Sequence, residues 1–174
     1  MNKLFAIIPF IILFTGIYSQ EVSGSMIFNR GVNASFNLYT LNTIQYGITR
    51  SDYTVIDLNF RDMPGGNTYT GFALYIQALQ PQLNGTTANI PLNKIKFTCS
   101  GTEVVNVFYV TDTSVLESKL STAMQPICYW ETTEGIARTD MVKLTYYIEP
   151  LLGFDSDNYF VEVDFVLRSY TGTP

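Results

Sequence analysis

The sequence predicts an all-β protein, an antiparallel β-sandwich of about eight strands, immunoglobulin-like or jelly-roll-like, with at most one short helix. Two observations predict this class. Tyr and Phe each occur 12 times, and Thr, Val and Ile recur throughout; these residue types pack well on a pleated surface. Apolar and polar residues also alternate with a period of two along most of the chain, as they do in half-buried strands.

The chain begins with the layout of a secretory signal peptide. Lys3 precedes an apolar run over residues 4–14, and the small residue Ser19 stands before the expected cleavage point. The alternative, an uncleaved anchor, needs about 20 apolar residues, and this run is shorter. We therefore expect a signal peptide at 1–19 and a single secreted β-sandwich domain at 20–174. The mature chain would have no transmembrane segment and would lie in the periplasm or at the cell surface.

The first strands are predicted by alternating runs on either side of a turn. Residues 51–63 and 69–79 flank Pro-Gly-Gly-Asn at 64–67, and glycine supplies the positive φ that tight turns need. Together these runs predict a β-hairpin. Residues 80–93 contain several turn-forming residues and predict a long connection.

The middle of the chain predicts two strands and one helix. Residues 95–99 and 103–111 have strand patterns, and the second is apolar on both faces. Residues 114–124 have helical spacing, with Ser114 and Glu117 placed as in a capping box. This segment is the expected helix.

Three alternating runs complete the predicted fold, at residues 127–131, 140–149 and 158–170. In the last run, the apolar side is expected to line the core and the charged side to face solvent or a partner chain. The charged residues, and thus the expected protein interface, are Glu162, Asp164 and Arg168.

Cys99 and Cys128 are the two cysteines of the chain. In an exported protein an isolated pair predicts one disulfide, whereas the spacing is far from the Cys-x-x-Cys of redox enzymes. Closing a loop of about 30 residues would stabilise the fold by roughly 3 to 4 kcal/mol in the chain-entropy model.

The composition excludes several classes of function. The formal net charge is −5, and loss of Lys3 with the signal peptide makes it −6. No cluster of Lys and Arg is visible in the sequence, so we expect no nucleic-acid partner. The chain has no histidine, which excludes Ser-His-Asp and Cys-His catalysis and most catalytic zinc sites. No motif implies a cofactor, and we expect none.

Aromatic residues predict a ligand platform on which a sugar ring could stack. The residues of this platform are Tyr129, Trp130, Tyr146 and Tyr147. The alternative is that they belong to the core, with Trp130 packed against the disulfide.

A cation site is suggested by oxygen-bearing side chains near the C-terminus. Asp155, Asp157 and Asn158 offer ligands for a hard cation such as calcium. Short Asp/Asn clusters are also what turns are made of, and the calcium-loop pattern is not met.

These observations favour binding over catalysis. We expect a secreted or cell-surface structural or adhesive protein that acts by protein-protein assembly or binding, with a protein partner or self-assembly on the cell surface. The alternative is a carbohydrate-binding module with a glycan ligand. The third hypothesis is a small glycoside hydrolase, which would need only a pair of carboxylates.

Overall fold

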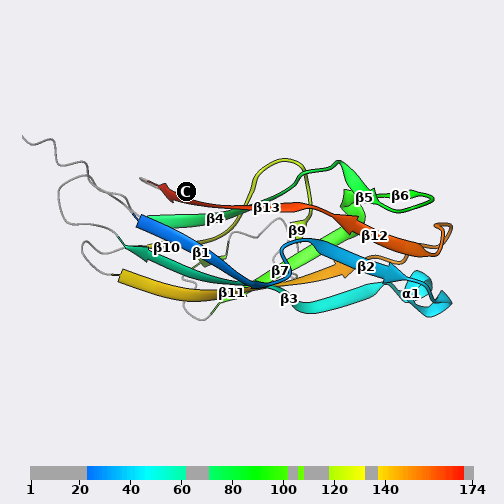
Figure 1. Ribbon diagram of the computed structural model, residues 1–174, viewed down its shortest axis with the longest axis horizontal. Helices are drawn as coiled ribbons and strands as arrows, with labels where there is room; N and C mark the ends of the chain where they lie inside the picture. The colour runs from blue at the N-terminus through cyan, green and yellow to red at the C-terminus, as the bar shows by residue number, and fades with distance from the viewer. Residues whose placement is uncertain (1–22, 62–70, 102–105, 108–117, 132–136, 171–174) are drawn as a thin grey trace, which may run out of the picture.

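The structure is a computed structural model that describes residues 23–61, 71–101, 106–107, 118–131 and 137–170 (Figure 1). Within these residues the chain is all-β with one short α-helix, which confirms the predicted all-β class and its single short helix. The predicted signal peptide lies outside them. No helix in the described part is long and apolar enough to cross a membrane.

The described elements follow one another in this order: β1 (Ser23–Arg30), β2 (Ala34–Leu38), α1 (Leu41–Tyr46), β3 (Ile48–Arg61), β4 (Gly71–Ala78), β5 (Gln82–Asn84), β6 (Asn89–Pro91), the 3₁₀ turn η1 (Leu92–Lys94), β7 (Ile95–Gly101), β8 (Asn106–Val107), β9 (Ser118–Lys119), β10 (Gln125–Glu131), β11 (Ala137–Ile148), β12 (Asp157–Val161) and β13 (Val163–Tyr170).

These strands form three antiparallel sheets. The five-stranded sheet has the order β1-β3-β11-β7-β9. The second sheet, β13-β4-β10-β8, and the third sheet, β2-β12-β5-β6, have four strands each. The described strands outnumber the expected eight for two reasons. The run at 158–170 is divided into β12 and β13, and the sequence analysis did not predict β1, β2, β5, β6 or β9 as strands.

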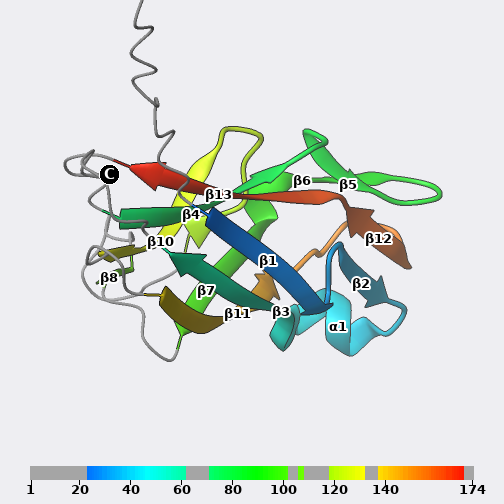
Figure 2. The same ribbon diagram turned by 60° about the vertical axis from the view of Figure 1, so that its left-hand side comes forward.

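The five-stranded sheet is covered by the other two sheets, one at each end. Phe60 of β3 lies 5.4 Å from Trp130 of β10 in the second sheet, measured between ring centroids. Phe36 of β2 in the third sheet lies 6.4 Å from Tyr146 of β11. In Figure 1, β4 and β13 lie above β3 and β11 at one end, and β2 and β12 lie toward the other. Figure 2 shows β5 and β6 at that second end, beyond β13.

The second and third sheets are joined where β12 runs into β13. Glu162 separates the two strands, and its carbonyl accepts a hydrogen bond from the N–H of Leu79 at 2.9 Å. The N–H of Glu162 donates to Oε1 of Gln80 at 2.9 Å. These bonds satisfy backbone groups that would otherwise lose their partners at the change of sheet.

The inward-facing residues follow the predicted period of two. Val142, Leu144, Tyr146 and Ile148 of β11 are buried, as are Tyr159 and Val161 of β12 and Val163 and Phe165 of β13. Burial of one apolar residue in every two stabilises each strand by about 1.5 to 3 kcal/mol per large side chain. The core therefore lies between the sheets along their whole length.

The predicted hairpin of 51–63 and 69–79 is wrong. β3 pairs with β1 and β11, whereas β4 pairs with β10 and β13 in the second sheet. Phe60 and Phe72, one from each strand, face each other across the core with ring centroids 5.0 Å apart. The alternation correctly identifies the buried face of each strand, but it carries no information about the pairing partner. The turn residues at 64–67 lie outside the described residues.

The predicted helix at 114–124 is also wrong in its described part. Ser118 and Lys119 form β9, which pairs with β7. The helix is instead α1, which begins after Thr40. The Thr40 hydroxyl accepts from the N–H of Thr43 at 3.2 Å, and the Thr43 hydroxyl accepts from the N–H of Thr40 at 3.2 Å. This is a capping box with Thr in place of the usual Glu or Gln, so a search for the usual pair misses it.

We expect Val163→Asp to unfold the domain or to lower its unfolding free energy by about 3 to 5 kcal/mol, because it buries an unpaired charge. Val163 is 5% exposed on β13. The matched control, Ser169→Asp, adds the same charge at an exposed position of the same strand and should change stability by less than about 0.5 kcal/mol. Urea denaturation of both variants measures the difference. Equal effects would contradict the assigned inward face.

Candidate functional site

The four aromatic residues of the predicted platform do not form one surface. Trp130 and Tyr146 are buried in the core, so the core alternative holds for both. The Trp130 indole N–H donates to Oδ2 of Asp140 at 2.8 Å, and the Tyr146 hydroxyl lies 3.2 Å from Oγ1 of Thr54. Burial raises the pKa of Tyr146, and its hydrogen bond with Thr54 only partly opposes this rise.

Tyr129 and Tyr147 are half-buried and lie on opposite sides of the molecule. Tyr129 follows the inward-facing Cys128 on β10, so its ring lies on the outer face of the second sheet, 6.1 Å from the ring of Tyr170. Tyr147 lies on the outer face of the five-stranded sheet, with Nζ of Lys96 6.0 Å from its ring centroid. A single sugar could therefore contact only one of these two rings.

Cys99 and Cys128 come from opposite sheets and meet across the core. Both are free thiols in the structure, Cys128 buried and Cys99 half-buried. Burial is the main cause that raises the pKa of Cys128 well above its usual value, and the neighbouring Cys99 thiol raises it further. The predicted disulfide would therefore tie β7 to β10, and it stays a prediction.

We expect the exported protein to contain the Cys99–Cys128 disulfide. Unfolding in denaturant without reductant should leave both thiols protected from alkylation, and unfolding with reductant should expose both to the reagent. Intact mass spectrometry reads this directly, with Cys99→Ser as the control that leaves one thiol. Double alkylation without reductant would contradict the bridge. The bridge should contribute roughly 3 to 4 kcal/mol to stability.

Asp157 binds the backbone of the β5–β6 turn. Its Oδ2 accepts hydrogen bonds from the N–H groups of Thr86 and Thr87, the latter at 3.0 Å, and its Oδ1 accepts from the N–H of Asn158 at 2.7 Å. Burial alone would raise the pKa of this carboxyl group. The N–H donors outweigh burial, because they stabilise the charged form, and the pKa is lowered.

The predicted calcium ligands are thus engaged differently. Asp155 is exposed, and Oδ1 of Asn158 accepts from the Ser35 hydroxyl at 3.3 Å. No group of three or more His, Cys, Asp and Glu side chains gathers around a point in the described part of the chain. Calcium takes six to eight oxygen ligands. In the structure, Asp157 holds a turn, which was the alternative to calcium binding for this short Asp/Asn cluster.

We expect Asp157→Asn to destabilise the protein at neutral pH and to make its unfolding free energy depend less on pH in the acid range. A carboxyl group whose pKa is lowered by folding contributes its full stability above its unfolded pKa, about 3.9. This contribution is lost as the pH falls through the lower folded value. Chemical denaturation from pH 7 to pH 2 measures the slope, with the exposed Asp155→Asn as control. An identical pH profile for Asp157→Asn and the wild type would contradict this role.

The three residues of the predicted interface each make a contact within their own chain. The contacts are Gln80 Nε2 to Glu162 Oε2 at 2.8 Å, Gln77 Nε2 to Asp164 Oδ2 at 3.2 Å, and the Arg168 guanidinium 5.9 Å from the Tyr75 ring centroid. Glu162 and Arg168 are exposed and Asp164 is half-buried. These side chains lie on the outer face of the second sheet and its junction with the third, and whether a partner binds there stays a prediction.

Two long strand edges lie side by side at one border of the molecule. Among the described residues, β1 pairs only with β3, and β13 pairs only with β4. Phe28 of β1 and Phe165 of β13 lie 5.5 Å apart between ring centroids, so the two edges are neighbours. Gly24 allows this approach, because a Cβ there would lie 3.0 Å from a methyl carbon of Leu167.

Most of the positive charges in the described part of the chain belong to one sheet. Seven Lys and Arg side chains are described, and all but Arg168 belong to the five-stranded sheet or to the turn η1 that leads into it. They are Arg30, Arg50, Lys94, Lys96, Lys119 and Lys143. They do not share one face, because Arg50 lies on the inner side of β3 and Lys96 and Lys143 lie on the outer side of the sheet. No such grouping is visible in the sequence, because these residues come from six separate elements.

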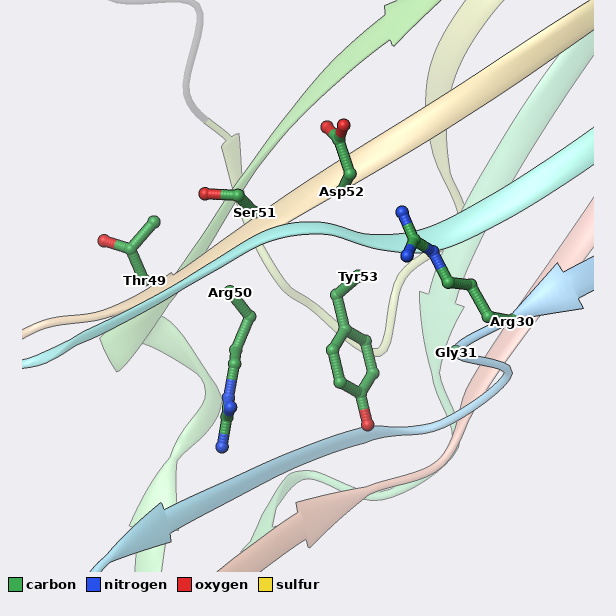
Figure 3. Close-up of a pocket in the computed structure, with 7 residues that line it drawn as sticks. All are labelled: Arg30, Gly31, Thr49, Arg50, Ser51, Asp52 and Tyr53. Atoms are coloured by element: carbon green, nitrogen blue, oxygen red, sulfur yellow. The ribbon is translucent and has the colours of Figure 1, made fainter.

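A cleft of about 420 Å³ opens where β1 turns away from β3. Its lining residues are Arg30, Gly31, Thr49, Arg50, Ser51, Asp52 and Tyr53 (Figure 3). We call it the arginine cleft. Figure 3 shows the side chains of Arg50 and Tyr53 on one side of β3 and those of Ser51 and Asp52 on the other.

A second cleft of about 360 Å³ adjoins the first on the outer face of the five-stranded sheet. It is lined by Thr49, Lys96, Phe97, Thr98, Thr145 and Tyr147, and we call it the tyrosine cleft. Thr49 lines both clefts, and its side chain lies on the outer side of β3, whereas the side chain of Arg50 lies on the inner side. Neither cleft contains two carboxylates.

Comparison with models of known protein families found no match, and comparison with curated proteins found none either. The function is therefore argued from the two strand edges.

Proposed function

We propose that this protein is a secreted or cell-surface structural or adhesive module, a β-sandwich of the immunoglobulin-like or jelly-roll-like kind, that binds a further protein chain along its strand edges. The observation that carries this proposal is the pair of neighbouring edges of β1 and β13, each eight residues long. A partner strand, from another protein or from a second copy, would add to either edge by backbone hydrogen bonds.

The composition of the edges supports strand addition. At about 3.3 Å per residue each edge offers roughly 26 Å of backbone. The middle of β1, from Ser25 to Asn29, contains neither Pro nor a charged residue, the residues that natural edge strands use to discourage pairing. β1 ends at Arg30, and β13 contains Asp164 and Arg168. Ile27, in the middle of β1, is 55% exposed and would contact a side chain of the added strand. Edges of this kind are expected to associate.

Exposed apolar side chains at one end of the molecule also support a binding role. Four of them lie on or beside α1, and the segment that carries Leu152 is tied to α1 by a hydrogen bond from the N–H of Leu151 to the carbonyl of Ile44 at 2.8 Å. They are Tyr39, Leu41, Tyr46 and Leu152, each more than half exposed. Exposed apolar groups of this size often mark contact sites.

We expect Ile27→Lys to weaken association without unfolding the domain, because it places a charge on an edge that a partner strand must cover. Size-exclusion chromatography with light scattering, run over a range of concentrations, measures association of the mature protein. Crosslinking on intact cells detects a different protein partner.

The matched control is Met141→Lys. Met141 is 40% exposed on β11, a central strand with partners on both edges, so this change should leave association unaltered. A mature protein that stays monomeric at high concentration and crosslinks to no partner would contradict the proposed function. Equal effects of the two variants would contradict the role of the edge.

A further inference from the structure

We propose that the chain bound at the edge of β13 is a second copy of this protein, paired β13 to β13 in antiparallel orientation about a two-fold axis at Val166. This inference rests on the proposed function, because it names the partner for one of the two edges. It is carried by the positions of two opposite charges on β13, Asp164 and Arg168.

β13 is a border strand that is open to further pairing. Among the described residues it pairs only with β4, in the second sheet (Figure 1). The N–H and C=O groups of successive residues in an antiparallel strand point alternately to its two sides, so about half of those in β13 face away from β4. A second antiparallel strand would give these groups hydrogen-bond partners within the protein.

The sequence of β13 is complementary to itself when the strand is reversed. Asp164 lies two residues before Val166, and Arg168 lies two residues after it. When the Val166 residues of two antiparallel copies lie opposite each other, Asp164 of each copy lies opposite Arg168 of the other. A two-fold interface therefore contains this pair of opposite charges twice.

The two charges cannot pair with each other within one chain. At about 3.3 Å per residue, four positions along a strand separate Asp164 and Arg168 by roughly 13 Å. Among the described residues, neither side chain forms an ion pair. Asp164 accepts a hydrogen bond from Nε2 of Gln77 to Oδ2 at 3.2 Å, which leaves Oδ1 to accept from an arginine. Directly opposite residues of two antiparallel strands have Cβ atoms about 4.5 to 5.5 Å apart, within reach of a carboxylate–guanidinium pair.

A contact with β4 holds the arginine where the pair would form. Asp164, Val166 and Arg168 share the outer face of the second sheet, because side chains alternate along a strand and Phe165 is buried. The Arg168 guanidinium lies 5.9 Å from the ring centroid of Tyr75, and Tyr75 pairs with Val166 in the register of β4 and β13. Arg168 is thus positioned close to the proposed axis before a second copy arrives, which lowers the entropy cost of binding.

The inner face of β13 gains apolar contacts in the same register. Phe165 of each copy lies opposite Leu167 of the other, and Leu167 is only half-buried in the single chain. Contact with the second copy would remove part of its remaining apolar surface from water. The core of each copy would thereby continue across the interface.

Charge also favours β13 over other strands as the partner. Charged residues on an edge discourage pairing with strands that bring an apolar or a like-charged residue against them. The middle of β1, from Ser25 to Asn29, has no charge to offer. A register of two β13 strands centred on Asp164 or on Arg168 would place like charges opposite each other, which is destabilising. Opposite charges at equal distances from Val166 therefore provide both attraction and selectivity.

The test measures dimerisation of the mature protein by analytical ultracentrifugation, and the wild type should form dimers. Asp164→Arg brings positive charges opposite each other at both pairs, and Arg168→Asp brings negative charges opposite each other. Each variant alone should therefore dimerise at least tenfold more weakly than the wild type. An equimolar mixture of the two variants should recover the wild-type dissociation constant within about threefold, because each chain then meets opposite charges in the other.

Asp155→Arg is the matched control, because it makes the same change of charge at an exposed residue outside the described strands. It should dimerise as the wild type does. Thermal melts show which variants are folded. If a charge variant does not fold, Val166→Lys takes its place, since it puts two like charges at the axis and should weaken the dimer at least tenfold.

Three results would overturn the proposal. They are a wild-type protein that stays monomeric, a folded variant of Asp164, Val166 or Arg168 that dimerises as the wild type does, and a mixture of the two charge variants that remains monomeric.

The same measurements separate this inference from the proposed function. A monomer that crosslinks to a different protein on cells keeps strand addition and removes self-pairing. A dimer that Ile27→Lys weakens and Asp164→Arg leaves intact keeps the edge of β1 as the binding site and removes pairing at β13. A monomer that crosslinks to no partner removes both.

Discussion

The length of β3 and β11 is the constraint on which the rest of the structure depends. They contain 14 and 12 residues, whereas the strands that cover them contain eight or fewer. At about 3.3 Å per residue, β3 extends some 20 Å beyond β4 or β13. One covering sheet would leave half of its apolar face in water. The molecule meets this constraint with two covering sheets placed end to end, and the chain changes sheet at Glu162 and again after Arg30.

The chain passes from the five-stranded sheet to the third sheet after Arg30, and this crossing gives rise to a buried polar cluster and to the arginine cleft. β1 must leave β3 so that β2 can join the third sheet. As a result, the part of β3 that precedes Val55 in the sequence is not paired with β1. The Thr54 hydroxyl ties the turning chain to β3 and also lies 3.2 Å from the Tyr146 hydroxyl in the core. A buried polar cluster of this kind fixes one arrangement of the strands, because each group needs its partner. The arginine cleft is a consequence of this crossing.

The strand edges and the clefts belong to different parts of the fold. Strand addition uses backbone groups at the borders of β1 and β13, where the two layers meet through Phe28 and Phe165. The clefts are lined by side chains on and beside the five-stranded sheet.

The sequence by itself determined the all-β class, the place of most described strands and the buried face of each, because period-two alternation is a local property of a strand half in contact with a core. The long connection predicted at residues 80–93 instead contains β5, β6 and the start of η1, and the N–H of Gly85 bonds to the carbonyl of Ala88 at 3.0 Å in the turn between the two strands. The strand partners were decided only by the tertiary structure. Alternation looks the same whether two strands pair edge to edge or face each other, as β3 and β4 do through Phe60 and Phe72. The arginine cleft depended on the same global choice: Arg30 and Arg50 are 20 positions apart in the sequence, and only the departure of β1 from β3 brings them to one cleft.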